Sequence, residues 1–349
     1  MHRLLERITI TDIAKELNIT AATVSRALNN HPGISEETKQ KVAEVAGRLN
    51  YKANKIASSL RSGKSHAIGV LIPSVEISFF GSVVHGIEQM ANKHGYNVLI
   101  YQTNESRDYE VKGIETFLSA RVDGILVSIA KETSEYSHFT EIKKRGIPIA
   151  FFDRAVDDLG ISSVVVNDYK GAFVATEHLI RQGYKHIAHI SGPLHIKIFN
   201  DRLKGYMGAL QANKIAVDHN LIYNGDVTIE AGKKAIQYFL EKEEKPDAVF
   251  AVEDYTALGA IKELKDRGIK MPEEFGVVGF ANELFGEHIT PSLTTIDQQT
   301  VMMGKESFKL LLNIIQHKGN KDNMPQKIIL DTIPIFRKSS LRINNNNMK

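Results

Sequence analysis

The sequence is 349 residues long, with 44 Lys and Arg against 41 Asp and Glu, and it contains neither Cys nor Trp. At about 100–200 residues per domain, this length predicts two or three domains. The lack of Cys excludes a disulfide scaffold, Cys-ligated zinc and a thiol nucleophile. No apolar run approaches the roughly 18 residues that a membrane helix needs, and residues 1–20 lack the apolar core of a secretory signal. We therefore expect a cytoplasmic protein with no membrane association.

The charge is distributed unevenly along the chain. Residues 1–65 carry 11 basic and 6 acidic side chains, a net charge of +5, and residues 66–349 sum to −2. A small basic segment joined to a slightly acidic body indicates a module that binds a polyanion such as nucleic acid.

Three short helices are predicted within residues 9–49. Thr9 and Asp12 have the spacing of a capping box, Thr20 can cap a second helix, and Ser35 opens a third. The side chains expected to face inward are Ile10, Ile13, Ala14, Leu17, Val24, Ala27, Leu28, Val42, Val45, Ala46 and Leu49.

The first two helices are separated by three residues, as in a helix-turn-helix unit. The side chains that the second helix is expected to expose are Ala21, Ala22, Ser25, Arg26 and Asn29. Arg26 can bind a guanine edge with two hydrogen bonds, and small residues allow a helix to lie deep in the major groove. Periodicity alone leaves an ordinary three-helix bundle, with Arg26 solvated, equally open.

Residues 8–51 resemble the DNA-binding headpiece of the lactose-repressor family of bacterial transcription regulators. The most specific segments are TVSRALN (Thr23–Asn29) and LNY (Leu49–Tyr51). The resemblance implies a headpiece over residues 1–52 whose DNA-facing residues are Thr20, Ala21, Ala22, Thr23, Ser25 and Arg26, with Ala21, Ala22 and Arg26 at the base-reading positions. Asn29 and Tyr51 complete the expected DNA-binding set of the headpiece.

Residues 53–65 resemble the hinge helix and linker of the same family. The resemblance implies that Asn54 belongs to the DNA-binding set and that Leu60 wedges into a minor-groove step, where apolar side chains unstack and bend DNA. Ala53 stands where the family usually has proline. A flexible interdomain linker is the alternative interpretation, since such a segment is expected to order only on DNA.

From residue 66 onward, short apolar runs alternate with amphipathic stretches. The expected strands are 66–73, 96–102, 122–129, 147–153, 162–167, 186–193, 220–227, 247–252 and 275–281, and the expected helices are 81–95, 107–121, 176–184, 202–214, 230–242 and 255–269. This alternation predicts an α/β fold with parallel sheets covered on both faces. Two rounds of it predict two lobes, with a ligand site between them at the carboxyl ends of the strands.

Residues 66–341 also resemble the lactose-repressor family, as a two-lobed effector-binding and dimerisation domain similar to periplasmic sugar-binding proteins. The fold class implied is α plus α/β, with a helix-turn-helix headpiece and hinge helix before the two lobes. Phe336–Ser340 resembles the closing strand of the family, and residues 342–349 are expected to be a disordered tail.

The family resemblance implies a set of effector contacts in the body. Phe79 and Phe80, expected in the loop after the first strand, match positions where an aromatic ring stacks on the ligand. Arg202 matches a hydrogen-bond donor and Asp254 an acceptor. The expected effector set is Phe79, Phe80, Asp153, Arg154, Arg202, Asp254 and Asn282. One aromatic face, one forked donor and carboxylate acceptors suit a small polar molecule such as a sugar.

Other interpretations of these residues remain open. The two phenylalanines could be core residues, and Arg202 and Asp254 could form a structural ion pair. Gly279–Asn282 has the sequence GFAN where relatives often carry GFDD or GFDN, so one carboxylate is missing. Ile196 and Ile198 occupy a loop where purine-sensing relatives place polar contacts, which disfavours a purine effector.

No motif of an enzyme is present: the sequence lacks GxGxxG after the first strand, GxSxG and HExxH. His186 and His189 have no evident partners, so neither metal nor cofactor is expected. The resemblance implies a homodimeric regulator, a repressor in the usual family outcome, that binds double-stranded operator DNA under control of a small-molecule effector. The alternatives are a transport binding protein, which needs an export signal, and a sugar- or nucleotide-processing enzyme using Asp153 and Asp254, to which the sequence assigns no acid and base roles.

Overall fold

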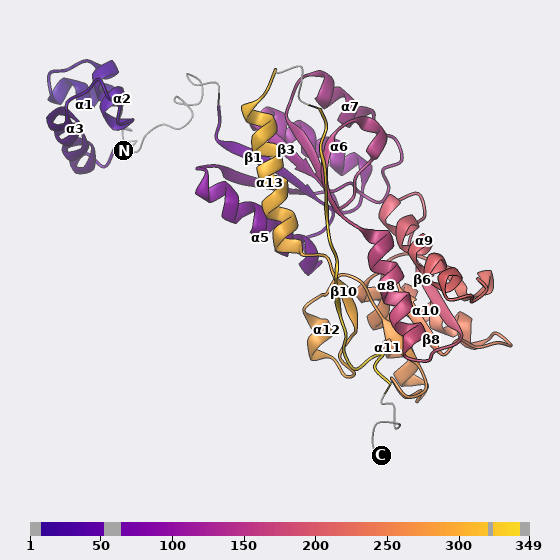
Figure 1. Ribbon diagram of the computed structural model, residues 1–349. Coiled ribbons are helices and arrows are strands. Elements are labelled where there is room, and N and C mark those ends of the chain that lie inside the picture. Colours follow the sequence, from indigo (N-terminus) through magenta and orange to yellow (C-terminus); the bar gives the residue numbers. More distant parts are fainter. Residues whose placement is uncertain (1–7, 52–63, 320–323, 343–349) are drawn as a thin grey trace, which may run out of the picture. The chain divides into compact units, whose positions relative to one another are not determined.

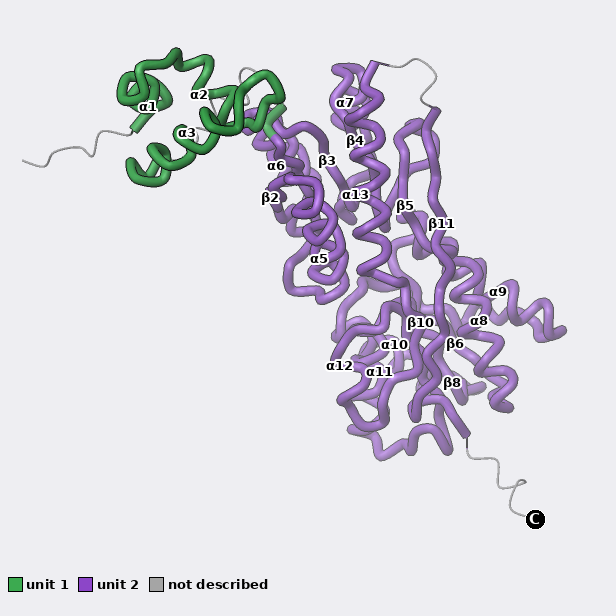
Figure 2. The backbone as a smooth tube through the Cα atoms, turned by 60° about the vertical axis from the view of Figure 1, so that its left-hand side comes forward, with its two compact units in different colours: residues 1–65 green, residues 66–349 purple. Residues whose placement is uncertain are grey.

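The computed structural model describes residues 8–51, 64–319 and 324–342. The chain divides into two compact units, residues 1–65 and 66–349, which Figure 2 shows in two colours. The predicted hinge helix, with Asn54 and Leu60, and residues 343–349 of the predicted tail lie outside the described residues. Within those ranges, no helix combines the length and the apolar character that a membrane span requires.

The first unit consists of three helices, as predicted: α1 (Ile10–Glu16), α2 (Ala21–Leu28) and α3 (Glu36–Arg48). The Asp12 carboxylate accepts a hydrogen bond from the backbone N–H of Thr9 at 2.8 Å. The hydroxyl oxygen of Thr20 accepts one from the N–H of Thr23 at 3.1 Å. These caps satisfy amides that the first turn of a helix leaves without partners.

The core of this unit follows the predicted periodicity with one exception. Ile13, Val24 and Val42 are fully buried. Leu28, which we expected to face inward, is 38% exposed. Ala27 already occupies the inward position of the last turn of α2, and Leu28 lies one residue further round the helix, at the edge of the apolar stripe.

The second unit has two lobes (Figure 1). The first lobe is built on a parallel sheet with the strand order β11-β5-β4-β3-β1-β2. Its strands are β1 (Ala67–Ile72), β2 (Asn97–Gln102), β3 (Gly124–Val127), β4 (Ile149–Phe152), β5 (Ser162–Val166) and β11 (Lys327–Leu330), and its helices are α5 (Ser78–Lys93), α6 (Arg107–Ser119), α7 (Ser137–Lys144) and α13 (Thr300–Gln316). Helices α5 and α13 cover one face of the sheet, and α6 and α7 cover the other.

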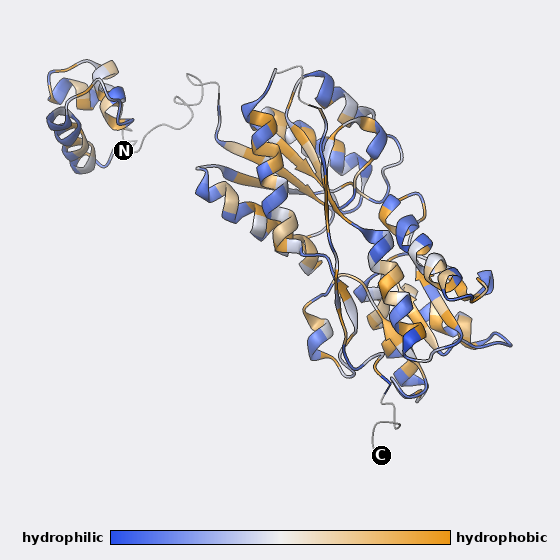
Figure 3. Ribbon diagram, in the orientation of Figure 1, coloured by the Kyte–Doolittle hydropathy of each residue, from blue (hydrophilic) through white to orange (hydrophobic). Residues whose placement is uncertain are grey.

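The second lobe repeats this plan with a four-stranded parallel sheet in the order β7-β6-β8-β9. Its strands are β6 (Ile187–Ser191), β7 (Ile222–Asn224), β8 (Ala248–Ala251) and β9 (Gly276–Val278), and its helices are α8 (Asp168–Arg181), α9 (Lys197–Ala212), α10 (Ile229–Leu240), α11 (Asp254–Asp266) and α12 (Phe285–His288). Helices α10 and α11 pack on one face and α8 and α9 on the other. Figure 3 shows the apolar strands enclosed between helices whose outer faces are polar. The α/β architecture predicted from the alternation is confirmed.

In the described part, the chain passes between the lobes at three places: after β5, between β10 (Thr295–Asp297) and α13, and between β11 and β12 (Ile333–Ile335). β10 and β12 pair antiparallel, which the sequence did not predict. The closing strand expected at residues 336–340 is wrong. Residues 338–340 form a turn, in which the Ser339 backbone accepts from the N–H of Val277 at 2.8 Å and donates to the carbonyl oxygen of Ser292 at 2.9 Å. The Ser339 hydroxyl adds bonds to the carbonyl oxygen of Val277 at 2.6 Å and from the N–H of Thr294 at 2.8 Å, so the segment is fixed by isolated bonds and not by a strand ladder.

Facing glycines set the spacing of one helix pair in each lobe. Gly86 on α5 faces Gly304 on α13, and a Cβ on Gly86 would overlap the carbonyl oxygen of Val301. The corresponding pair in the second lobe is Gly232 on α10 and Gly259 on α11. Because each contact joins backbone to backbone, no side-chain rotation can make room for a methyl group.

We predict that Gly86→Ala lowers the free energy of unfolding by about 1–3 kcal/mol, the usual cost of overpacking a close contact. Gly81→Ala on the same helix is the matched control, because nothing lies within 4 Å of the added Cβ. It should be neutral or stabilise by up to about 1 kcal/mol through helix propensity. Urea unfolding of both variants makes the comparison, and equal stability of the two would disprove the packing argument.

Candidate functional site

The exposed face of α2 is the candidate DNA-reading surface. Ala22 and Arg26 are exposed on it. The Arg26 side chain makes no hydrogen bond or ion pair with any residue in the described ranges, so its five N–H donors are available to a ligand. The exposed side chain is compatible with both interpretations of Arg26, solvation by water and contact with DNA bases, so only a binding experiment distinguishes them.

Other residues of the expected DNA-binding set have partners within the headpiece. Ala21 and Tyr51 are half-buried and pack against the core of the three helices. The Asn29 amide donates to the carbonyl oxygen of Ser25 at 2.8 Å, and the hydroxyls of Thr20 and Thr23 lie 2.9 Å apart. These contacts fix the shape of the surface from which Arg26 projects.

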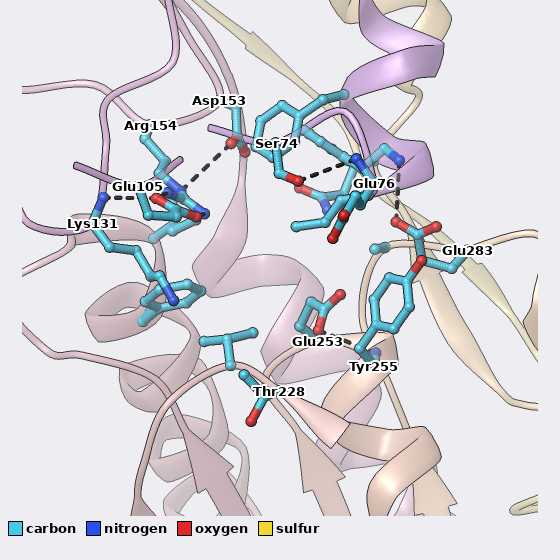
Figure 4. A pocket seen from close by; sticks show the side chains of 18 of the residues that line it. Ser74, Glu76, Glu105, Lys131, Asp153, Arg154, Thr228, Glu253, Tyr255 and Glu283 are labelled. Carbon is cyan, nitrogen blue, oxygen red and sulfur yellow. Dashed lines mark hydrogen bonds and ion pairs between the residues drawn. The ribbon is translucent and has the colours of Figure 1, made fainter. Parts of the chain in front are cut away.

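A cavity of about 490 Å³ lies between the two lobes, at the carboxyl ends of strands from both sheets (Figure 4). Its lining residues are Ser74, Glu76, Ile77, Phe79, Phe80, Glu105, Lys131, Asp153, Arg154, Ile198, Phe199, Arg202, Val227, Thr228, Ile229, Glu230, Glu253, Tyr255, Ala281, Glu283 and Gln298. This is the place where parallel α/β sheets bind ligands. Of the expected effector set, the structure brings Phe79, Phe80, Asp153, Arg154 and Arg202 together here.

Arg202 is 2% exposed and is held by four segments of the chain. Its Nε donates to Asp168 at the start of α8 at 2.8 Å, and one terminal nitrogen donates to the Val252 carbonyl at 2.8 Å. The other donates to Gln298 at 3.2 Å, and its guanidinium carbon lies 3.8 Å from the centre of the Phe280 ring. Burial raises the pKa of Asp168 to about 6, although the Arg202 guanidinium opposes the rise.

The ion pair considered between Arg202 and Asp254 is wrong, because the arginine pairs with Asp168. Asp254 is fully buried in the first turn of α11 and does not line the cavity. Its two oxygens accept from the Thr295 hydroxyl and the N–H of Glu283, each at 2.7 Å. Burial raises the pKa of Asp254 to about 7. The neighbouring Glu253 lines the cavity in its place.

Asn282 also lies outside the cavity lining. Its amide donates to Asp297 at 2.8 Å and its carbonyl accepts from Arg337 at 3.0 Å. Ala281, which stands where relatives often carry Asp, does line the cavity, and Glu283 two residues further on supplies a carboxylate there.

Glu283 joins the two lobes at the start of α5. The carboxylate of Glu283 accepts hydrogen bonds from the Ser78 hydroxyl and from the N–H of Phe79, the latter at 3.1 Å. Phe79 and Phe80 therefore lie in the first turn of α5 and not in a loop, which corrects the expectation from sequence. They are 7% and 2% exposed, so each is at once a core residue and part of the cavity wall.

Asp153 and Arg154 follow β4 and are buried at the cavity wall. Arg154 donates twice to Glu105, at 2.7 and 3.1 Å. Asp153 accepts from the Ser128 hydroxyl at 3.2 Å, and burial is the main cause that raises the pKa of Asp153. Among the residues that the structure describes, no group of three or more His, Asp or Glu side chains could hold a metal ion.

Comparisons with known proteins match both units. Residues 9–54 match the model of bacterial regulatory proteins, lacI family, and residues 65–336 match the periplasmic binding proteins and sugar binding domain of LacI family. Catabolite control protein A of Priestia megaterium is 33% identical over 323 residues, which are 92% of this chain and 96% of that protein.

Among the similar solved structures, some cover nearly the whole chain. The lac repressor dimer bound to operator and the anti-inducer ONPF has a TM-score of 0.85 at 25% identity, covering 97% of this chain and 100% of that one. The complex of the transcriptional regulator CelR with cellobiose has a TM-score of 0.72 at 26% identity, covering 96% and 100%.

We predict that Arg202→Met destabilises the second unit by about 3–5 kcal/mol, because it leaves the buried Asp168 carboxylate without its cation. Arg181→Met is the control: Arg181 forms an exposed pair with Glu177, and such pairs contribute about 0–1 kcal/mol. The double variant Arg202→Met with Asp168→Asn should recover part of the loss. Urea unfolding measures all three, and a cost for Arg202→Met no larger than for Arg181→Met would contradict the prediction.

Proposed function

We propose that a small polyhydroxylated molecule controls the affinity of this protein for operator DNA. The chain belongs to the LacI family of bacterial regulatory proteins. The protein is a DNA-binding transcription regulator and not an enzyme. The observation that carries the proposal is the combination, in one chain, of a helix-turn-helix unit with an exposed Arg26 and a cavity between two lobes. The expected outcome of operator binding is repression in the cytoplasm.

The DNA-reading role is assigned to α2 and the hinge segment. Ala22 and Arg26 would meet base edges in the major groove, with Ala21 beside them, because an exposed arginine on a recognition helix can bind guanine with two hydrogen bonds. The hinge helix, residues 54–60 within the 53–65 linker, would place Leu60 in a minor-groove step. Two copies would read two half-sites about one helical turn apart.

A homodimer is the state that this interpretation requires, and the edge strand β2 supports it. Leu99 and Ile100 on β2 are 39% and 50% exposed. An exposed apolar edge strand invites pairing or cover by another chain. The domain boundaries proposed are a headpiece over 1–52, a hinge over 53–65 and an effector and dimerisation domain over 66–341.

The effector would act through contacts that cross between the lobes beside the cavity. Lys131 pairs with Asp226 at 2.7 Å, and the His195 ring nitrogen lies 2.7 Å from the carbonyl oxygen of Lys131. Glu283 holds the start of α5. A ligand that contacts Lys131 and Glu283 shifts the balance between lobe arrangements, and by linkage DNA changes the effector affinity by the same factor.

The experiment that tests this function is selection of bound sequences from a random duplex library by the full chain, at fixed salt, with and without a panel of sugars. We expect enrichment of a palindrome whose binding one class of sugar changes. If no sequence is enriched in any of the conditions, the operator-binding role is refuted. Deleting residues 1–64 should abolish DNA binding while sugar binding persists, whereas a transport protein would lose nothing.

We predict that Arg26→Ala weakens binding to the selected operator by about tenfold or more, since a bidentate base contact is worth about 1–3 kcal/mol. Binding to random DNA should fall much less, because phosphate contacts carry no sequence information. Fluorescence anisotropy on both duplexes makes the measurement. Lys41→Ala is the control, since Lys41 pairs with Glu37 on the exposed face of α3. Equal losses on both duplexes would show that Arg26 contacts phosphate only.

We predict that Leu60→Ala reduces the bend that the protein induces in operator DNA, because a methyl group is too small to hold a base step apart. Energy transfer between dyes at the two ends of the operator reports the bend. Ser59→Ala serves as the control for a neighbouring change. If the Leu60→Ala variant bends the operator as strongly as the unsubstituted chain does, the wedge role is lost.

A further inference from the structure

The cations that line the cavity all have partners within the protein. Arg154 pairs with Glu105 and Lys131 with Asp226. Arg202 pairs with Asp168 at 2.8 Å. Each ion pair brings its own carboxylate, so these three side chains leave no positive charge to balance the further acids of the wall.

Three further carboxylates gather at one end of the cavity. Figure 4 shows Glu76, Glu253 and Glu283 around the Tyr255 ring, away from Lys131 and Arg154. No ion pair involves any of the three among the described residues. We call Glu76, Glu253, Glu283 and Tyr255 the acidic end.

The environment of this end disfavours the charged forms of Glu253 and Tyr255. Burial, and then the neighbouring carboxylates of Asp254 and Glu283, raise the pKa of Glu253 well above its ordinary value. Burial, followed by the carboxylates of Glu283 and Glu253, also raises the pKa of Tyr255. A positive charge placed among these groups would relieve that repulsion.

A second feature of the cavity wall is the carboxylate of Asp153, which can accept a hydrogen bond from a ligand. Asp153 is 5% exposed and lines the cavity, and only its Oδ2 accepts a hydrogen bond, from the Ser128 hydroxyl at 3.2 Å. Within the described residues, its Oδ1 has no hydrogen-bond partner. Because Asp153 lines the cavity, this oxygen is available to accept a hydrogen bond from a ligand.

We propose that the effector is an amino sugar whose protonated amine binds at the acidic end, among Glu76, Glu253 and Glu283 and beside the Tyr255 ring. This inference rests on the proposed function of the cavity as an effector site. Carboxylates together with an aromatic face are the chemistry that recognises an ammonium group. A neutral hydroxyl leaves the surplus negative charge unbalanced, and a phosphate or uronate adds to it.

The test compares sugars that differ only in an amine for a hydroxyl, by isothermal titration calorimetry on the full chain at pH 7. The pairs are glucosamine with glucose, galactosamine with galactose, mannosamine with mannose, and the glucosamine disaccharide with cellobiose. N-acetylglucosamine controls for the shape of the substituent without its charge. Glu253→Gln and Glu283→Gln remove one charge each, and Glu287→Gln is the matched control on exposed α12, outside the lining.

We expect at least one amine to bind at least tenfold tighter than its hydroxyl partner and its N-acetyl form. That preference should fall about tenfold in Glu253→Gln and in Glu283→Gln and persist in Glu287→Gln. If Glu283→Gln disturbs the contact of Glu283 with Ser78 and Phe79 in the other lobe, the result for Glu253→Gln alone tests the amine proposal. Tighter binding of neutral sugars, or a preference that both charge-removing variants retain, overturns the amine proposal and leaves the proposed function intact. Binding by neither series overturns both.

Discussion

The buried guanidinium of Arg202 is the constraint around which the second lobe is organised. A fully buried arginine must place its charge against a carboxylate and its donors on acceptors. Arg202 does so on the start of α8, the end of β8 and the segment that returns to the first lobe, with Phe280 beneath it. The same side chain forms part of the cavity wall, so the geometry of the ligand site is set by a network that the fold needs for its own stability.

The beginnings of helices determine which side chains reach the cavity. The N-terminus of α5 binds the Glu283 carboxylate from the other lobe. The first turn of α11 buries Asp254, while Glu253 caps this helix by accepting from the N–H of Tyr255 at 3.1 Å and lines the cavity. Helix N-termini offer unpaired N–H groups that attract carboxylates. Glu253 and Glu283 therefore do both: each accepts a hydrogen bond at a helix N-terminus and each lines the cavity.

The family resemblance supplied five residues of the cavity wall, and sequence patterns predicted the headpiece helices and the alternating strands and helices. Periodicity suffices there because buried strands are continuous apolar runs, and Asp153 and Arg154 directly follow such a run. Periodicity did not distinguish Glu253 from Asp254, because a shift of one residue decides which of the two side chains lines the cavity. Glu283 was missed because its partners, Ser78 and Phe79, lie some two hundred positions away. The start of α5 at Ser78 has no capping side chain to mark it, so Phe79 and Phe80 were placed in a loop.

The facing glycines have a mechanical consequence. Backbones that touch along α5 and α13, and along α10 and α11, give each lobe a stiff spine with little internal compliance. Deformation then concentrates where the chain crosses from one lobe to the other, near Asn167, Gln299 and Asp331. A closure of the cavity would therefore move each lobe as a rigid body, instead of being absorbed as local strain within it. A larger residue at one of these glycines would separate the paired helices, and the lobe would then move less as a rigid body while it kept its fold.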